Sequence, residues 1–139
     1  LFLEDDYVEV IDFKTGKELK DFSYKKSKEG EDYVNIKKHN YKQQLMFYKI
    51  LIENSKRYKN KEVKQGKICF VDDDKISEII IDFKKDISKE EWNDFIKLII
   101  NTFKMIKNII ILQKIDLSKY QNNINGILSF ENDIINNNL

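Results

Sequence analysis

The segment Tyr7–Gly16, with the sequence YVEVIDFKTG, decides the predicted fold. Successive side chains of a β-strand point to opposite faces of the sheet, so residues two apart share a face. One face of this segment carries Val8, Val10, Asp12 and Lys14, and the other carries Tyr7, Glu9, Ile11 and Phe13. Apolar residues on both faces predict an interior strand that ends at the turn-forming Gly16.

The segments on either side of this strand are predicted to be a short strand and a loop. Leu1–Leu3 are apolar and precede the acidic run Glu4–Asp6, which predicts the end of another strand joined by a hairpin turn. Because Leu1 is not a start methionine, we expect the chain to be a fragment that opens in mid-hairpin. Residues 15–39 are polar and rich in lysine, and they are predicted to form a mobile loop.

The middle of the chain predicts a helix followed by a hairpin. Asn40 is the expected N-cap of an amphipathic helix that ends near Lys56. Its apolar positions recur at offsets of four, three and four, at Tyr41, Leu45, Tyr48 and Ile52. Two apolar runs at 68–71 and 78–83 flank the acidic turn 72–74 and predict a β-hairpin.

The last third of the chain contains the strongest helical pattern. Ser88 and Glu91 form a capping box, after which apolar residues continue at helical spacing at Trp92, Phe95, Ile96, Ile99, Ile100, Phe103 and Ile106. The pattern weakens beyond Ile115, and residues 132–139 are predicted to fray. The whole pattern predicts one α/β domain over residues 1–139, with a mixed sheet flanked by helices.

The charge of the chain is unevenly distributed. The net charge is +1, but residues 14–67 contain 16 lysines and arginines against 7 acids, and residues 1–13 contain 5 acids and no base. A basic region beside an acidic cluster suits a phosphate-binding surface around a metal, although solvated helix faces give the same pattern. Cys69 is the only cysteine, and no apolar run of about 18 residues could cross a bilayer. We therefore expect a cytoplasmic protein without a membrane partner.

Asp12 and Lys14 are the candidate catalytic residues. In a strand, two residues at this spacing project from one face roughly 6.6 Å apart, so a carboxylate and an ammonium can meet at one phosphate. The carboxylate offers a hard oxygen ligand to Mg²⁺ or Mn²⁺, and the lysine can position a water or stabilise developing charge. An isolated Asp-x-Lys is more often a surface pair, and Asp82-Phe83-Lys84 repeats the triplet. Only the first triplet continues into Thr15-Gly16 and precedes the helix with Gln44 and Tyr48.

The combination of two motifs carries a family resemblance. Val10-Ile11-Asp12-Phe13-Lys14-Thr15-Gly16 resembles the "ΦΦDYKTG" segment of RecB-like nucleases in the PD-(D/E)xK superfamily, and Gln44 with Tyr48 resembles their Q-x-x-x-Y motif. The resemblance implies a restriction-endonuclease-like core in which Asp12 binds metal, Lys14 is catalytic, and Gln44 and Tyr48 contact DNA or support the lysine. Independently of the family, Gln44 and Tyr48 stand four apart and share a helix face. Without the first motif, a core tyrosine and an exposed glutamine would be the simpler interpretation.

The chain also differs from the family in two respects. Relatives carry another metal-binding aspartate that would fall just before Leu1, so we expect the N-terminal part of the fold to be missing. We expect the isolated fragment to bind metal poorly or to be inactive. Some relatives hold an iron–sulfur cluster with about four cysteines, which a single Cys69 excludes. Cys69 is predicted to be a small buried residue and His39 a solvated one.

The resemblance implies a Mg²⁺-dependent deoxyribonuclease, exonucleolytic rather than endonucleolytic, in a helicase–nuclease for DNA repair and recombination. Its partners would be DNA and a helicase domain or subunit. A stand-alone or CRISPR-associated RecB-like nuclease is the nearest alternative. Two further alternatives are a non-catalytic nucleic-acid-binding or scaffolding module of the same fold, and a general interaction domain in which Asp12 only pairs with Lys14.

Overall fold

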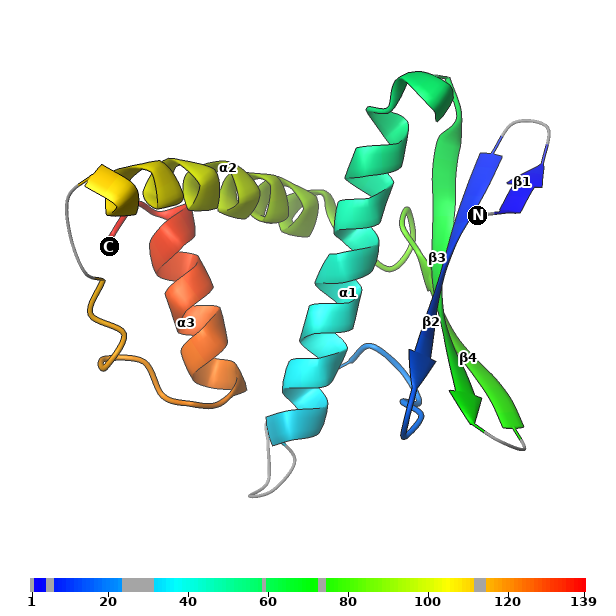
Figure 1. Cartoon of the computed structure of the whole chain (residues 1–139), viewed down its shortest axis with the longest axis horizontal. Helices are drawn as coiled ribbons and strands as arrows, with labels where there is room; N and C mark the ends of the chain where they lie inside the picture. Colours follow the sequence, from blue (N-terminus) through cyan, green and yellow to red (C-terminus); the bar gives the residue numbers. More distant parts are fainter. Residues whose placement is uncertain (1, 5–6, 24–31, 59, 73–74, 112–114) are drawn as a thin grey trace. The chain divides into compact units, whose positions relative to one another are not determined.

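The computed structural model describes the chain except for residues 1, 5–6, 24–31, 59, 73–74 and 112–114 (Figure 1). Its elements are β1 (Phe2–Glu4), β2 (Tyr7–Thr15), α1 (Asp32–Glu53), the 3-10 helix η1 (Lys56–Tyr58), β3 (Glu62–Asp72), β4 (Lys75–Asp82), α2 (Lys89–Ile111) and α3 (Ile124–Ile135). They fall into two compact units, Leu1–Ile87 and Ser88–Leu139. All four strands and α1 belong to the first unit.

The first unit contains a mixed sheet with the strand order β1-β2-β3-β4. The pairs β1/β2 and β3/β4 are antiparallel, whereas β2 and β3 run parallel. Parallel neighbours need a crossover connection, which α1 provides. The predicted interior position of β2, the opening hairpin and the later hairpin are therefore confirmed, and so is the α/β class with a mixed sheet.

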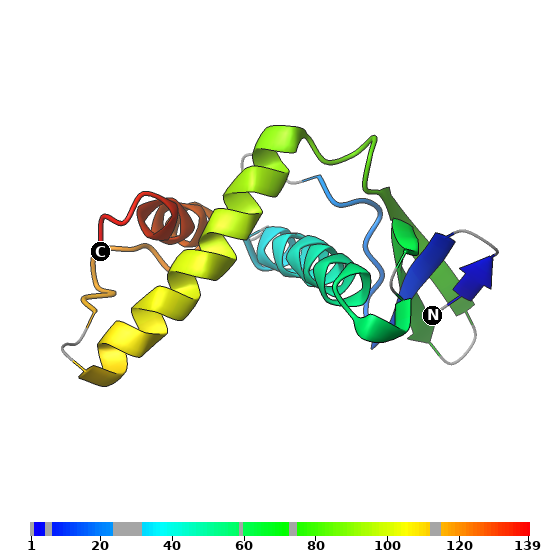
Figure 2. The same ribbon diagram turned by 90° about the horizontal axis from the view of Figure 1, so that it is seen from above.

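Helix α1 covers one face of this sheet (Figures 1 and 2). That face carries the alternate strand residues Val8, Val10, Val63, Ile68, Phe70, Ile79 and Ile81, all of which are buried. Leu45 and Met46 are buried on the helix side. The period of two in the strands and the helical period in α1 thus meet in one apolar layer, which is the core of the unit.

Gly66 in β3 sets how closely α1 approaches the sheet. A Cβ placed there would lie 3.1 Å from the ring of Phe83 and 3.2 Å from both methyl groups of Leu45. These side chains are fully or almost fully buried, so they have little room to move aside. The missing side chain at Gly66 is therefore part of the helix–sheet packing.

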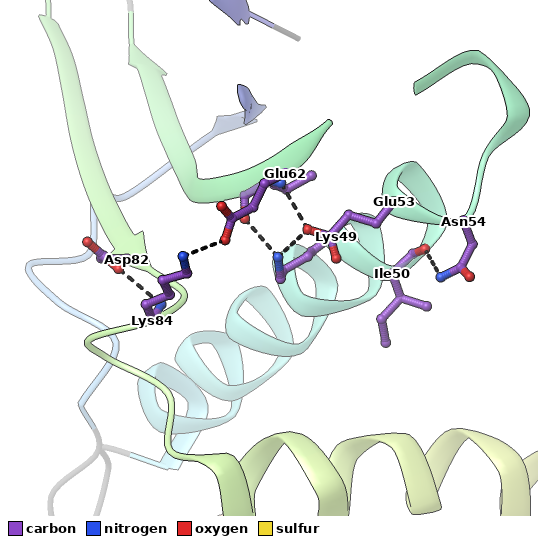
Figure 3. A network of polar contacts seen from close by, with 8 residues as sticks. Lys49, Ile50, Glu53, Asn54, Glu62, Asp82 and Lys84 are labelled. Carbon is purple, nitrogen blue, oxygen red and sulfur yellow. Dashed lines mark hydrogen bonds and ion pairs between the residues drawn. The ribbon is translucent and has the colours of Figure 1, made fainter. Parts of the chain in front are cut away.

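The end of α1 is joined to the start of β3 by a polar network (Figure 3). The Lys49 ammonium pairs with the Glu53 carboxylate and donates to the carbonyl of Val63 at 2.8 Å. Glu53 in turn accepts from the amide of Val63 at 2.9 Å. Nearby, Lys84 pairs with Glu62 at 2.9 Å. The helix terminus is thus fixed against the strand that follows the crossover.

The opposite face of the sheet carries polar and exposed apolar residues. Glu9 is only 8% exposed, pairs with Lys67 at 3.0 Å and accepts a hydrogen bond from Gln65. Phe13 on the same face is 67% exposed. Because Gln65 and Lys67 interrupt any apolar run, the sequence pattern predicted β3 from Ile68 only, whereas the strand begins at Glu62.

Helix α1 begins earlier than predicted. It starts at Asp32, so Asn40 is an exposed residue inside the helix and is not its N-cap. Residues 32–39 of the predicted mobile loop are helical, and residues 24–31 lie outside the described part. The prediction of a solvated His39 was wrong, because His39 and Asn35 are the buried residues of the first turns. Two polar residues in buried positions hide the apolar period on which the helix prediction depended.

The second unit consists of α2 and α3. The hydroxyl of Ser88 accepts from the amide of Glu91 at 3.1 Å, which confirms the predicted N-cap of α2. The side-chain amide of Asn101 donates to the carbonyls of Ile134 and Ile135 and joins the two helices. Residues 132–135, predicted to fray, are therefore helical. None of the helices among the described residues is both long and apolar enough to cross a membrane.

Gly66→Val is expected to destabilise the protein by about 1–3 kcal/mol, because the added side chain would overlap Leu45 and Phe83 in a packed core. Leu45→Ala alone should cost about 2–5 kcal/mol by leaving a cavity. The double variant should lose less stability than the sum of the two single losses, since the valine fills part of that cavity. Urea unfolding of the four proteins measures this coupling, and strict additivity would show that the two sites do not touch.

Candidate functional site

Asp12 and Lys14 lie on the face of β2 that α1 covers. Asp12 is opposite the buried Ile68 and Lys14 is opposite the buried Phe70 on β3. The Lys14 ammonium lies 2.9 Å from Oδ2 of Asp12, and the two side chains are 23% and 17% exposed. The spacing of two on a strand thus brings the predicted pair together at the border between core and solvent.

The carboxylate of Asp12 is incompletely satisfied. Its Oδ2 is buried, and no described residue donates a hydrogen bond to it. The Lys14 ammonium pairs with this oxygen at 2.9 Å but is not aligned for a hydrogen bond. Since buried oxygens are normally hydrogen-bonded, a charged oxygen in this state has unused capacity for a cation or a water.

Tyr41 connects the pair to helix α1. The Lys14 ammonium lies 5.0 Å from the centroid of the Tyr41 ring, within the range of a cation–π interaction. The Tyr41 ring also packs against Phe70, with centroids 6.2 Å apart. The lysine is therefore held between a carboxylate on its own strand and an aromatic ring on the helix.

Lys37 lies one turn before Tyr41 and contacts the same ring. Its ammonium is 5.5 Å from the Tyr41 centroid and 5.7 Å from that of Phe70. It also donates to the carbonyl of Lys17 at 3.2 Å. Two lysines from different elements thus meet at one tyrosine.

Gln44 and Tyr48 continue the same side of the helix. The side-chain amide of Gln44 donates to the Tyr48 hydroxyl at 2.7 Å. With Lys37 and Tyr41 they are spaced by four, three and four residues, so all four form one stripe along α1. The stripe reaches β2 through the contact between Tyr41 and Lys14.

The position of Gln44 along the sheet follows from the rise per residue of the helix and of the strands. The contacts of Tyr41 with Phe70 and of Leu45 near Gly66 show that α1 runs back along β3 as the helix proceeds. Three helical residues advance about 4.5 Å, a little more than one strand residue. Starting from Lys14, these ideal rises bring Gln44 between one and two strand residues back towards Asp12.

The loop after β2 is anchored to α1 next to Lys37. The Lys38 ammonium lies 2.7 Å from Oδ1 of Asp21 and donates to the carbonyl of Ser23 at 2.7 Å. Hydrogen bonds from Lys38 and from the Ser23 hydroxyl lower the pKa of Asp21 to about 2. Gly16, with φ of +100°, takes the left-handed conformation that turns the chain out of β2 into this loop.

The second Asp-Phe-Lys triplet has a different structure. Asp82 ends β4, and its carboxylate accepts from the backbone amides of Lys84 and Lys85 in a turn. The side-chain directions are reversed, because Phe83 is buried at 2% exposure whereas Phe13 is 67% exposed. Lys84 is exposed and pairs with Glu62. The repeated triplet is therefore a turn, not a second copy of the Asp12 site.

Cys69 is buried, as the sequence predicts. Its thiol donates to the Glu78 carboxylate at 3.5 Å. Burial and this carboxylate raise the pKa of the thiol above its usual range. A protonated, enclosed thiol is a poor nucleophile.

The donor set around Asp12 suits a weakly held hard cation. Mg²⁺ is commonly bound through one or two carboxylates, with waters and substrate phosphates completing its octahedron. Asp12 supplies one such carboxylate, whose Oδ2 is buried and lies 2.9 Å from the Lys14 ammonium. No cluster of three or more histidine, cysteine, aspartate or glutamate side chains suitable for a metal is present in the described part of the chain. The protein ligands described here would therefore hold a metal only together with water or substrate.

Comparisons of the chain with models of protein families, with curated proteins and with solved structures gave no match. The nuclease interpretation therefore rests on the residues themselves and on their arrangement.

Sequence reasoning missed Lys37 and assigned Tyr41 only to the apolar face of a helix. Lys37 fell inside the predicted mobile loop, where its spacing from Tyr41 carried no meaning. The useful signal was the spacing of four, three and four from Lys37 to Tyr48, which becomes visible once the helix is known to start at Asp32.

Asp21→Asn is expected to destabilise the protein at pH 7, by no more than about 1 kcal/mol because the ion pair is largely exposed. The pKa of Asp21 is lowered by folding, so its contribution is present above about pH 4 and is lost as the pH falls towards 2. Urea unfolding of both proteins across this range measures the difference. A difference that persists unchanged at pH 2 would contradict the assigned ion pair.

Proposed function

We propose that the chain is a metal-dependent DNA nuclease module with a restriction-endonuclease-like core. The observation that carries the proposal is the Asp12–Lys14 pair on the helix-covered face of β2, in which the ammonium lies 2.9 Å from a buried carboxylate oxygen. Among the described residues no hydrogen-bond donor is aligned with that oxygen, so the carboxylate keeps lone pairs for a further partner. The parallel β2/β3 pair, the α1 crossover and the two hairpins supply a mixed sheet of the kind the resemblance implies.

Each residue has a distinct task in the proposed reaction. Asp12 offers an oxygen to Mg²⁺ or Mn²⁺, which when bound lowers the pKa of a water and neutralises charge at the phosphodiester. Lys14, held by Tyr41 and Asp12, places a positive charge where the phosphate becomes more negative. Gln44 and Tyr48 present a fixed amide and phenol on the adjoining stripe, which can position the DNA strand.

The resemblance places such a module in a helicase–nuclease of DNA repair and recombination, and this setting is part of the proposal. The basic composition of residues 14–67 supports a polyanionic substrate. Lys14, Lys37 and the loop anchored by Lys38 all come from that region.

One observation favours a second candidate, a nucleic-acid-binding module without turnover. Asp12 stands without further carboxylates in a metal-binding cluster among the described residues. Such a module would use the lysine and aromatic contacts for binding and would not hydrolyse the strand.

The full-length protein is expected to degrade linear DNA in the presence of Mg²⁺, and Asp12→Ala or Lys14→Ala should lower the rate at least about a hundredfold. Lys84→Ala is the matched control, because it changes the lysine of the other Asp-Phe-Lys triplet and should leave the rate unchanged. Gel assays of labelled DNA measure the rates. Equal activity in all four proteins would exclude Asp12 and Lys14 as the catalytic centre, while retention of DNA without cleavage by any of them would favour the binding module.

Mg²⁺ or Mn²⁺ at a concentration about tenfold above Kd is expected to raise the Tm of the wild-type protein by about 5 °C, because binding to the folded state stabilises it. EDTA should reverse the shift. Asp12→Asn should abolish it, since the amide offers a weaker ligand than the carboxylate. Thermal unfolding followed by circular dichroism measures this without any turnover. An undiminished shift in Asp12→Asn would place the metal elsewhere.

A further inference from the structure

We propose that Lys37 and Tyr41 form, with Lys14, a phosphate-binding cradle for the backbone of a DNA strand. The inference rests on the proposed function, because it assigns a substrate contact next to the same aspartate. It concerns binding, however, and can be tested where no cleavage occurs.

Two like charges lie at one aromatic ring. The ammonium groups of Lys14 and Lys37 lie 5.0 and 5.5 Å from the centroid of Tyr41. The ring face attracts cations but does not neutralise them, so the two lysines repel each other. Phosphate groups bound at the two ammonium groups would relieve this repulsion.

The two lysines differ in their pairing with acidic groups. Lys14 has the carboxylate of Asp12 at 2.9 Å. The contacts of Lys37 within the described residues are a backbone carbonyl and two aromatic rings, and none of them carries a formal negative charge. A phosphate oxygen would accept a charge-assisted hydrogen bond from this ammonium and supply the negative charge that its other contacts lack.

The side chain of Lys37 is already held in place before a phosphate binds. Lys37 is held by the carbonyl of Lys17 and by the rings of Tyr41 and Phe70, whereas a lysine on an open helix face samples many rotamers. Its charge is thus already placed beside the catalytic pair, and little conformational freedom is lost when a phosphate binds.

The shape of the stripe favours a strand over an isolated phosphate. From Lys37 to Tyr48 the helix advances by about 16 Å, several times the 3.4 Å step between nucleotides of one strand. Ammonium, aromatic, amide and phenol groups follow one another along it. A row of polar groups of this length can contact several consecutive nucleotides of one strand.

The test is binding of a fluorescein-labelled single-stranded DNA oligonucleotide to the full chain in EDTA, followed by fluorescence anisotropy at several salt concentrations. Lys37→Ala and Tyr41→Leu should each weaken binding about five- to tenfold, and Lys37→Ala should reduce the slope of log K against log salt by about 0.7. Tyr41→Phe keeps the ring and should therefore lose less affinity than Tyr41→Leu. Lys104→Ala, which changes an exposed lysine of α2, should also leave the affinity unchanged.

The outcomes separate this inference from the proposed function. Wild-type affinity and slope in Lys37→Ala, an equal loss in Lys104→Ala, or no binding by the wild type would each overturn the cradle. Lys37→Met, which keeps the apolar stem, replaces Lys37→Ala if circular dichroism shows that the latter is unfolded. Binding that depends on Lys37 in a protein that cleaves no DNA would support the cradle and reject the nuclease. DNA cleavage and binding that are both unchanged in Lys37→Ala would support the nuclease and reject the cradle.

Discussion

Parallel pairing of β2 with β3 is the constraint on which the first unit depends. Two neighbouring parallel strands cannot be joined by a tight turn, so the chain must leave the sheet and return, and α1 makes that crossover. The helix buries Leu45 against Gly66 and, one turn earlier on the same face, brings Tyr41 to Lys14. The same crossover therefore builds the core and completes the candidate site.

The site combines features that would be unfavourable in a purely structural region. Among the described residues no hydrogen-bond donor is aligned with the buried Oδ2 of Asp12, and Lys14 and Lys37 bring two positive charges to one ring. The surrounding contacts hold these groups in place, because Phe70 supports the ring of Tyr41 from the sheet. Unsatisfied polar groups held by a packed scaffold are typical of binding and catalytic sites, which is the physical basis of the proposed function.

The sequence predicted the elements whose apolar period is regular. Strand β2 and the helix that follows Ser88 were placed correctly because nearly every expected position is apolar. It failed where buried positions are polar, as at Asn35 and His39 in α1, and where the open face of β3 carries Gln65 and Lys67. The Asp12–Lys14 pair followed from strand geometry alone. The role of Tyr41 did not, since a tyrosine that faces a core and a tyrosine that holds two lysines have the same spacing.

The central claim is that Asp12, Lys14 and the stripe on α1 meet a phosphate at one divalent cation. The most direct measurement is a crystal structure of the full chain with Mn²⁺ and a phosphorothioate dinucleotide, in which anomalous scattering locates the metal. The account predicts Mn²⁺ at roughly 2.1–2.2 Å from a carboxylate oxygen of Asp12, with the bound phosphate between that metal and the lysines at Tyr41. Metal and phosphate bound away from Asp12, with Lys14 still paired only to its carboxylate, would contradict it.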